Sequence, residues 1–316
     1  MSHRLLLLSK HARDYRALVD AAALPGLSII STADPAEAAA GASSFDLGFG
    51  EPSLLRQVLP ALTSVTWLQS TWAGVEPLLD PALRRDYTLT NARGVFGPQM
   101  SEYVFGYLLA HERKMFEKHA AQAERRWDPE PPGRLRGKTL GLLGVGTIGA
   151  SIAATAKHFG MHVKGYTRMS EDSADVDRYF HGDIVQCAAA FAADLDYLVA
   201  VMPDTKATRH LVDDKLLRAL PSRCLFVNPG RGGVVNETAL AAALRDGRLA
   251  GAVLDVFEKE PLPADHLFWQ LPNVHITSHT AALSAPPDIA PLFIDNYRRL
   301  LRGEPLRYRV DFERGY

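Results

Sequence analysis

Short apolar runs alternate along the chain with longer stretches in which apolar residues recur at helical spacing. In the first hundred residues, the apolar runs predict strands at 4–9, 27–31, 45–49, 65–69 and 87–91. The stretches between these runs predict helices at 12–23, 35–40, 52–62 and 75–83. Because strands that alternate with helices at these lengths form βαβ units, we expect a parallel sheet in this region.

A second alternating series begins after residue 138. It is preceded by a long stretch with helical spacing, 98–126, and by a proline-rich loop, 128–133. Its apolar runs predict strands at 139–143, 162–166, 197–201, 224–228, 251–255 and 274–277. A helix is predicted directly after the first of these runs, at 147–159, and a last helix at 285–301. The pattern therefore predicts parallel-sheet domains of the α/β class.

Composition excludes several classes of protein. A chain of 316 residues has room for roughly two domains. The 35 basic and 36 acidic residues leave a formal net charge of −1, which is not typical of a protein that binds nucleic acid. Two cysteines, Cys187 and Cys224, are too few for a disulfide framework or a cysteine metal site, so we expect a reducing, cytoplasmic compartment and no metal. The longest early apolar run, 5–8, is too short for a signal peptide or a spanning helix.

The most informative motif is a glycine-rich turn between a predicted strand and a predicted helix. Residues 144–149 read Gly-Val-Gly-Thr-Ile-Gly. In this context Gly144 allows a tight turn, Gly146 lets the backbone approach a pyrophosphate, and Gly149 lets the helix pack closely against the strand. The amide groups at the start of the helix, at Thr147 and Ile148, would face the phosphate charge. We therefore expect a dinucleotide cofactor at this turn.

The residues at the end of the next predicted strand should determine whether the protein binds NAD or NADP. NAD sites usually carry Asp or Glu about 20 residues after the turn. Here Thr167 and Arg168 follow the strand, and an arginine can hold a 2′-phosphate by forked hydrogen bonds. NADP is therefore expected, with NAD as the alternative. If the strand extends further than predicted, Glu171 or Asp172 could bind a ribose instead.

Three later segments each place charged or titratable side chains after a predicted strand. The segments are 227–234 with Arg231, 255–263 with Asp255 and Glu260, and 273–281 with His279. In open α/β sheets, ligands bind beyond the carboxyl ends of the strands. The three segments are therefore expected to belong to one site.

Taken in order, these segments resemble the D-isomer-specific 2-hydroxyacid dehydrogenase family over almost the whole chain. Further matching features are Glu102, Trp127, the run 137–141 before the glycine turn, and the motif Pro203-x-Thr205-x-x-Thr208. The resemblance implies that Arg231, Glu260 and His279 are catalytic. It also implies that Asp255 lies beside the nicotinamide, and that Pro203 and Thr208 contribute to cofactor binding.

The implied roles suit the chemistry of a 2-keto acid. The planar guanidinium of Arg231 can clamp a carboxylate and polarise the neighbouring carbonyl group. His279 can give a proton to the carbonyl oxygen as hydride arrives from the cofactor. Glu260 can orient the imidazole and favour its cation.

The resemblance also covers a loop of the first domain. Residues 70–75 match the family's loop whose backbone amides hold the substrate carboxylate, which implies that Trp72, Ala73 and Gly74 bind substrate. Trp72 could line the pocket or only pack. The run 91–100 is most similar to the glyoxylate/hydroxypyruvate reductase branch.

For the whole molecule, the resemblance implies two Rossmann-like domains. A flavodoxin-like substrate-binding domain would comprise 1–98 and 284–316, and a NAD(P)-binding Rossmann domain would comprise 99–283. The family forms two-fold dimers through the region of the long helix, whose apolar positions exceed what one small domain would cover. A homodimer is therefore expected. The expected binding partner is a small 2-keto or 2-hydroxy acid. Nucleic acid and membranes are not expected as partners.

Two alternative functions stay open at this stage. A phosphoglycerate dehydrogenase-like enzyme that uses NAD would share the site. A dinucleotide-sensing corepressor of the same family would keep the site without a metabolic role. Formate dehydrogenase is disfavoured, because that branch has Gln where this chain has Glu260.

Overall fold

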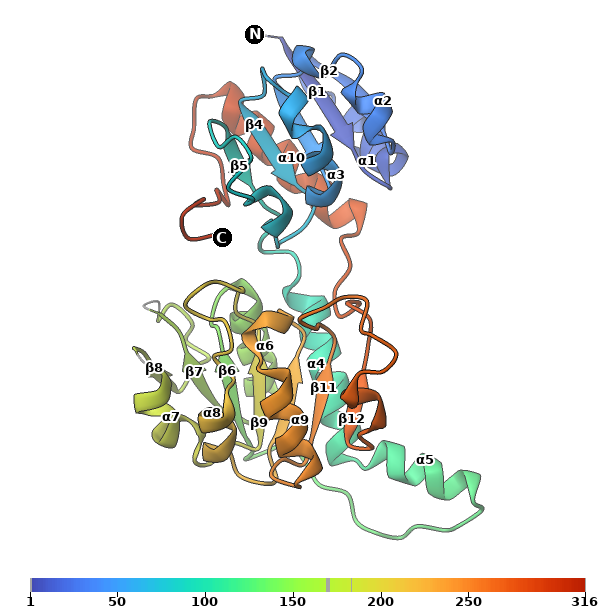
Figure 1. Cartoon of the computed structure of the whole chain (residues 1–316), viewed down its shortest axis with the longest axis vertical. Coiled ribbons are helices and arrows are strands. Elements are labelled where there is room, and N and C mark those ends of the chain that lie inside the picture. Colours follow the sequence, from blue (N-terminus) through green and yellow to red (C-terminus); the bar gives the residue numbers. More distant parts are fainter. Residues whose placement is uncertain (1, 169–170, 183, 316) are drawn as a thin grey trace. The chain divides into compact units, whose positions relative to one another are not determined.

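The structure of the protein is a computed structural model that describes residues 2–168, 171–182 and 184–315. The chain forms two compact units, Met1–Val95 with Ser284–Tyr316, and Phe96–Leu283 (Figure 1). Each unit is built around a parallel β-sheet that is flanked by helices, which confirms the expected α/β class.

Among the described residues, the first unit has a five-stranded sheet with the order β2-β1-β3-β4-β5. Its strands are β1 (His3–Leu8), β2 (Leu27–Thr32), β3 (Leu47–Gly50), β4 (Trp67–Ser70) and β5 (Thr88–Thr90). Its helices are α1 (Ala12–Ala21), α2 (Pro35–Ala39), α3 (Pro52–Val58) and α10 (Pro286–Leu301), with short 3-10 turns at η1 (Ala42–Ser44), η2 (Leu59–Ala61) and η3 (Glu76–Leu78). Because β4 ends at Ser70, the loop expected to bind substrate begins at the carboxyl edge of this sheet.

The last helix, α10, completes the core of the first unit. Phe293 on this helix is fully buried, and its ring stacks on Phe49 of β3 and Trp67 of β4 with centroids 4.9 and 5.2 Å apart. On the other side of the sheet, Leu6 and Leu8 of β1 pack in a cluster with residues of α2 and α3. Residues from both ends of the chain therefore build one core.

The second unit has a seven-stranded sheet, within the described residues, with the order β12-β11-β10-β9-β6-β7-β8. Its strands are β6 (Thr139–Leu143), β7 (His162–Tyr166), β8 (Arg178–Phe180), β9 (Tyr197–Ala200), β10 (Leu225–Asn228), β11 (Gly251–Leu254) and β12 (Val274–Ile276). Its helices are α4 (Gly97–Glu112), α5 (Met115–Ala123), α6 (Thr147–His158), α7 (Ile184–Ala192), α8 (Asp214–Ala219) and α9 (Glu237–Arg245), with 3-10 turns at η4 (Gly232–Val234) and η5 (Leu267–Gln270).

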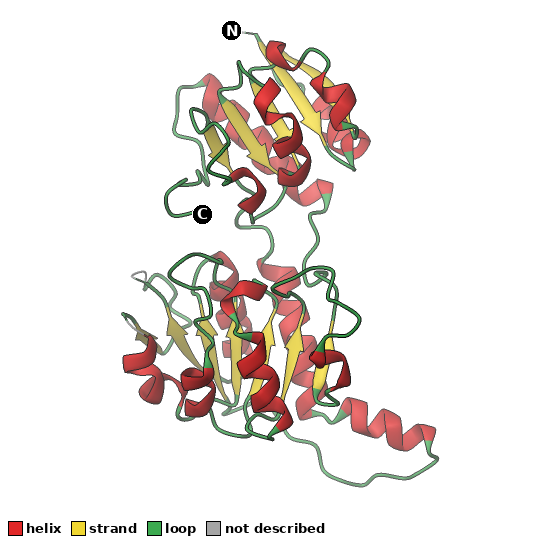
Figure 2. Cartoon of the chain, viewed as in Figure 1, coloured by secondary structure: helices red, strands yellow, loops and turns green. Residues whose placement is uncertain are grey.

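Helices cover both faces of this sheet (Figure 2). Along β9, Tyr197 and Val199 pack into the cluster that contains α4 and α6, whereas Leu198 and Ala200 pack into the cluster that contains α7, α8 and α9. A strand that is buried on both faces is a continuous apolar run, which explains why these strands could be predicted. The strand order reverses between β6 and β9, the position at which open α/β sheets bind ligands.

Two of the helix predictions were wrong. The helix predicted at 75–83 is only the short turn η3, because Pro77 and Pro81 remove backbone donors and the residue before a proline avoids the helical region. The long helix predicted at 98–126 is two helices, α4 and α5, separated at Lys114, whose φ of 53° lies in the left-handed region. The sequence prediction also missed the short strand β8.

Within the described residues, no helix is both long and apolar enough to cross a membrane.

Candidate active site

The glycine-rich turn connects β6 directly to α6, as expected. Gly144 has a φ of 102°, and its amide donates to the carbonyl of Tyr166 on β7 at 2.9 Å. A Cβ on Gly149 would lie 2.2 Å from the carbonyl oxygen of Gly144, so only glycine lets the helix approach the turn this closely. A Cβ on Gly146 would meet nothing within 4 Å, and Thr147 and Ile148 open the helix beside this free space. The turn therefore fits a dinucleotide phosphate.

The loop after β9 lies against the glycine turn. A Cβ on Gly144 would lie 3.1 Å from the amide nitrogen of Met202, so the two backbones are in close contact. The Thr208 hydroxyl donates to the carbonyl of Pro203 at 2.6 Å and accepts from the amide of Thr205 at 2.8 Å. Thr208 thus holds the shape of this loop, which contains both predicted residues, Pro203 and Thr208, and meets the glycine turn at Met202.

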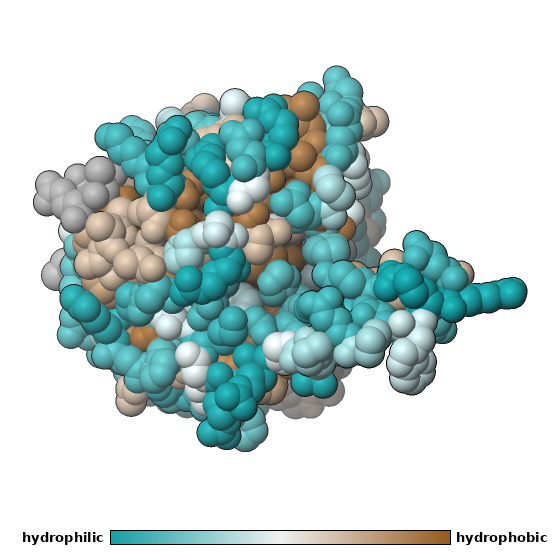
Figure 3. Space-filling view, turned by 90° about the horizontal axis from the view of Figure 1, so that it is seen from below, coloured by the Kyte–Doolittle hydropathy of each residue, from teal (hydrophilic) through white to brown (hydrophobic). Residues whose placement is uncertain are grey.

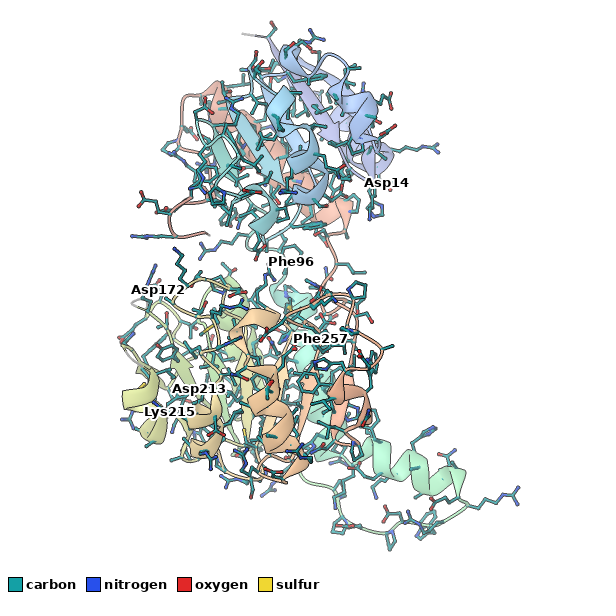
Figure 4. All side chains as sticks on the ribbon, in the orientation of Figure 1. Asp14, Phe96, Asp172, Asp213, Lys215 and Phe257 are labelled. Atoms are coloured by element: carbon teal, nitrogen blue, oxygen red, sulfur yellow. The ribbon has the colours of Figure 1, made fainter. Side chains whose placement is uncertain are left out.

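The residues expected to select the cofactor follow β7, which ends at Tyr166 as predicted. The amide of Thr167 donates to the carbonyl of Phe180 at 3.1 Å, and Arg168 is exposed. Glu171, the alternative ribose ligand, has its carboxylate Oε1 2.6 Å from Nε2 of His181. Asp172, the second alternative, lies at the edge of the unit (Figure 4).

Arg231 lies in a tightly packed loop after β10. The buried side chain of Asn228 bridges this loop, since its Nδ2 donates to the carbonyl of Arg231 at 3.0 Å and its Oδ1 accepts from the amide of Gly230 at 3.1 Å. A Cβ on Gly232 would lie only 1.9 Å from the carbonyl carbon of Phe257. The loop that carries Arg231 is therefore pressed against the loop that follows β11, where Figure 4 shows Phe257.

Asp255 is fully buried at the end of β11 and organises the turn that carries His279. Its Oδ1 accepts from the Thr277 hydroxyl at 2.5 Å and the Thr280 amide at 2.8 Å, and its Oδ2 accepts from the Ala281 amide at 2.9 Å. Its backbone carbonyl accepts from the amide of His279 at 2.8 Å. Both carboxylate oxygens are thus engaged with this turn, and the expectation that Asp255 contacts the cofactor stays a prediction.

His279 and Glu260 form a direct pair. Nδ1 of His279 lies 2.8 Å from Oε2 of Glu260, and Oε1 of Glu260 accepts from the amide of Phe257 at 3.0 Å. His279 has a φ of 56°, a left-handed conformation that the turn around Asp255 enforces. The imidazole remains 54% exposed, so its second nitrogen, Nε2, is available for a reaction.

Two residues that support this turn were missed by sequence reasoning. Thr277 connects Asp255 to the hydroxyl of Tyr103 on α4, at 2.7 Å. Burial raises the pKa of Tyr103 well above its usual range, and the nearby Asp255 adds to the shift, so Tyr103 stays protonated. Thr277 is the last residue of a predicted strand and could have been found by its position at the carboxyl end. Tyr103 lies within a helical pattern and gives no comparable signal.

The expected substrate loop is ordered by its own hydrogen bonds within the first unit. Oγ of Ser70 accepts from the amide of Trp72 at 2.9 Å, and the carbonyl of Trp72 accepts from the amide of Ala92 at 3.0 Å. The side chain of Asn91 donates to the carbonyl of Ala73 at 2.9 Å, and Gly74 follows directly. The Trp72 side chain is 38% exposed, and its role as a pocket lining stays a prediction.

Comparison with known proteins identifies relatives for both units. The family profile described as D-isomer specific 2-hydroxyacid dehydrogenase, NAD binding domain, matches residues 105–281. A glyoxylate/hydroxypyruvate reductase A from Klebsiella pneumoniae is 34% identical over 220 residues, which cover 70% of each chain. A D-isomer specific 2-hydroxyacid dehydrogenase family protein from Aeromonas salmonicida is 41% identical, with a TM-score of 0.92 over 99% of this chain and 100% of that one. An NADPH-dependent glyoxylate/hydroxypyruvate reductase from Sinorhizobium meliloti, solved with NADP and sulfate, is 28% identical, with a TM-score of 0.86 over the full length of both chains.

The close contact at Gly232 leads to a prediction about stability. Gly232→Ala places a Cβ against the backbone of Phe257, so the two loops must separate, and we expect a loss of roughly 1–3 kcal/mol in the free energy of unfolding. Urea unfolding followed by circular dichroism measures this change. The matched control is Gly106→Ala in α4, where an added Cβ meets nothing within 4 Å and should not destabilise. Equal midpoints for both variants would contradict the prediction.

Proposed function

This chain belongs to the D-isomer-specific 2-hydroxyacid dehydrogenase family, and we propose that it reduces a small 2-keto acid to the D-2-hydroxy acid with NADPH. The observation that carries this proposal is the hydrogen bond between Glu260 and Nδ1 of His279, in a turn built around the buried Asp255. Glyoxylate and hydroxypyruvate are the proposed substrates, because relatives with these names match most of the chain.

His279 is proposed as the group that exchanges a proton with the substrate oxygen. An ionised carboxylate can only accept a hydrogen bond, so the contact with Glu260 places a proton on Nδ1 of His279. This leaves Nε2 as the nitrogen that donates a proton to the carbonyl oxygen during reduction and takes it back in the reverse direction. Glu260 is in turn held by the Phe257 amide, which orients the pair.

Arg231 is proposed to bind the substrate carboxylate and polarise the adjacent carbonyl group. Its guanidinium keeps its charge at any physiological pH and offers parallel N–H donors. The bridge from Asn228 and the packing of Gly232 hold the backbone on both sides of Arg231 in a fixed shape. The loop at Trp72, Ala73 and Gly74 is proposed to bind the substrate as well, through the backbone amides of Ala73 and Gly74, because the Trp72 amide donates to Oγ of Ser70.

The nicotinamide dinucleotide supplies the hydride when it is bound. We propose that its pyrophosphate contacts the amides at Gly146, Thr147 and Ile148, beside the free space at Gly146, while Gly144 provides the tight turn. Thr167 and Arg168 are proposed to receive the adenosine ribose, with Arg168 holding a 2′-phosphate. Pro203, Thr208 and Asp255 are the proposed contacts nearer the nicotinamide.

We propose that the chain forms a homodimer through its second unit. α5 and the segment after it reach out beyond the body of this unit, as Figures 1 and 3 show. Three large apolar side chains there are exposed, namely Met115, Phe116 and Trp127, the last of them to 90%. A hollow between α4, α5, β12 and η5 is lined in part by the exposed side chains of Phe116 and Trp269. Exposed apolar surface of this kind marks protein interfaces.

A reducing compartment, the cytoplasm, is proposed as the location. Neither Cys187 nor Cys224 forms a disulfide bond within the described part of the chain, and burial strongly raises the pKa of the Cys224 thiol, which keeps it unreactive.

The catalytic assignment predicts different kinetic effects for two residues. We expect His279→Ala to lower kcat for keto-acid reduction by about 100- to 10,000-fold with little change in KM, because proton transfer belongs to the transition state. Arg231→Ala should raise KM as well as lower kcat, because it also binds the ground state. Steady-state assays with glyoxylate and NADPH give both constants. The control is His158→Ala, an exposed histidine in the last turn of α6. A fully active His279→Ala variant would rule out the mechanism.

The role of Arg168 predicts a cofactor preference. One charge-assisted hydrogen bond to the 2′-phosphate should favour NADPH by roughly 10- to 100-fold in kcat/KM, and Arg168→Ala should remove most of this factor while NADH use stays the same. Arg245→Ala, at an exposed arginine at the end of α9, serves as the control. Equal or better use of NADH by the wild type would refute the assignment.

The proposed dimer is tested by molar mass. Light scattering at micromolar concentration should give about twice the 34.6 kDa of the chain. Phe116→Asp replaces an exposed apolar ring of the proposed interface with a charge and should shift the mass to that of the monomer. Ile30→Asp, at another exposed apolar side chain, should leave the dimer intact. A monomeric wild type would contradict the proposal.

A further inference from the structure

His181, which directly follows β8, has a partner for each of its two ring nitrogens. Nδ1 of His181 lies 2.9 Å from the carbonyl oxygen of Thr167, and Nε2 lies 2.6 Å from Oε1 of Glu171. One ring therefore joins both sides of the loop that also carries Arg168. None of the roles proposed above uses His181.

Both partners of His181 are acceptors, and this determines its protonation state. A peptide carbonyl and an ionised carboxylate can only accept, whereas a neutral imidazole has a single N–H to donate. The two contacts are satisfied together only by the imidazolium form, which donates from both nitrogens. Consistently, the hydrogen bond to Glu171 and, next, that to Thr167 raise the pKa of His181 above its usual value of 6.5.

Tyr179 of β8 holds the same loop without involving a charge. Its ring stacks on that of His181, with centroids 6.2 Å apart and planes 6° from parallel. Its hydroxyl donates to the carbonyl of Ser173 and accepts from the Ser173 amide, both at 3.1 Å. The segment that carries Glu171 therefore stays beside β8 even if His181 loses its proton. Among the described residues, Glu171 is the charged group whose field acts on His181.

We propose that His181, as an imidazolium, neutralises and holds Glu171 and thereby sets the specificity of the protein for NADPH over NADH in a pH-dependent way. This inference rests on the proposed binding of the 2′-phosphate at Arg168. His181 acts as a positioning residue, because it works through Glu171 and not through contact with the reacting atoms.

The consequence for specificity follows from the charge of Glu171. An acidic residue after this strand typically accepts from the ribose 2′-hydroxyl of NAD and would repel the 2′-phosphate of NADP. While His181 is protonated, its donated hydrogen bond occupies that carboxylate and offsets its charge. A pKa that is raised in this arrangement means that the pair is intact at low pH and is lost as pH rises through the raised value. The preference for NADPH should therefore decline with rising pH.

The experiment measures the dissociation constants of NADPH and NADH between pH 7 and 9 by quenching of tryptophan fluorescence. A phosphate with a pKa of about 6 stays doubly charged over this range, so the ligand itself does not titrate. For the wild type, we expect the ratio of the NADH to the NADPH constant to fall about fivefold across the range, the effect of one exposed charge at contact distance.

Three variants isolate the pair. His181→Gln keeps an amide donor without the charge, so at pH 7 it should already show the lower ratio and no further decline. Glu171→Gln should keep the high ratio at every pH. The double variant His181→Gln/Glu171→Gln should recover the high ratio, because the carboxylate that repels the phosphate is gone. His162→Gln, an exposed histidine at the opposite end of β7, is the matched control and should behave as the wild type.

The possible results separate this inference from the proposed function. If His181→Gln weakens both cofactors equally and Glu171→Gln does not rescue it, His181 only maintains structure and the inference is overturned. If the wild type prefers NADPH equally at all pH values, the inference also fails, whereas the assignment of Arg168 stands. If the wild type prefers NADH throughout, the proposed NADPH function is the one that fails.

Discussion

The buried carboxylate of Asp255 is the constraint on which the candidate site depends. It lies at the end of β11 and accepts hydrogen bonds from the Thr277 hydroxyl and from the amides of Thr280 and Ala281. A buried carboxylate is stable only when such donors surround it, so the turn that follows β12 must adopt the conformation that supplies them. That conformation places His279 in the left-handed region and within reach of Glu260. One buried charge thus positions the whole histidine pair.

Most of the fold could be predicted because its strands are buried on both faces. Strands such as β6 and β9 are continuous apolar runs between turns, so a reading of the sequence alone locates them to within a residue or so. The errors lie where the deciding interaction is not local. The break at Lys114 depends on a single left-handed residue in an otherwise helical pattern. β8 has three residues, and it is recognisable as a strand only by its pairing with β7.

In the candidate site, too, some residues could be predicted from the sequence and others could not. Arg231, Glu260, His279 and the glycines could be predicted as site residues because they lie after predicted strands in motifs that resemble those of a known family, and their roles stay predictions. The residues that hold them were harder to find. Asn228 lies within the segment 227–234, but its bridge across the Arg231 loop is visible only in three dimensions. Tyr103 reaches Thr277 from a helix far away in the sequence. Supporting contacts of this kind depend on packing, which no local pattern encodes.

The return of α10 to the first unit has a consequence for synthesis of the chain. Phe293 supplies the ring that stacks on Phe49 and Trp67, so Met1–Val95 emerges from the ribosome with that side of its sheet incompletely covered, although Tyr15 of α1 packs against Phe49. The intervening residues, Phe96–Leu283, contain a complete sheet with helices on both faces and can fold while translation continues. Met1–Val95 can therefore complete its core only after the residues of α10 have been synthesised. During this interval its apolar surface is open to chaperones, or to the same surface of another nascent chain.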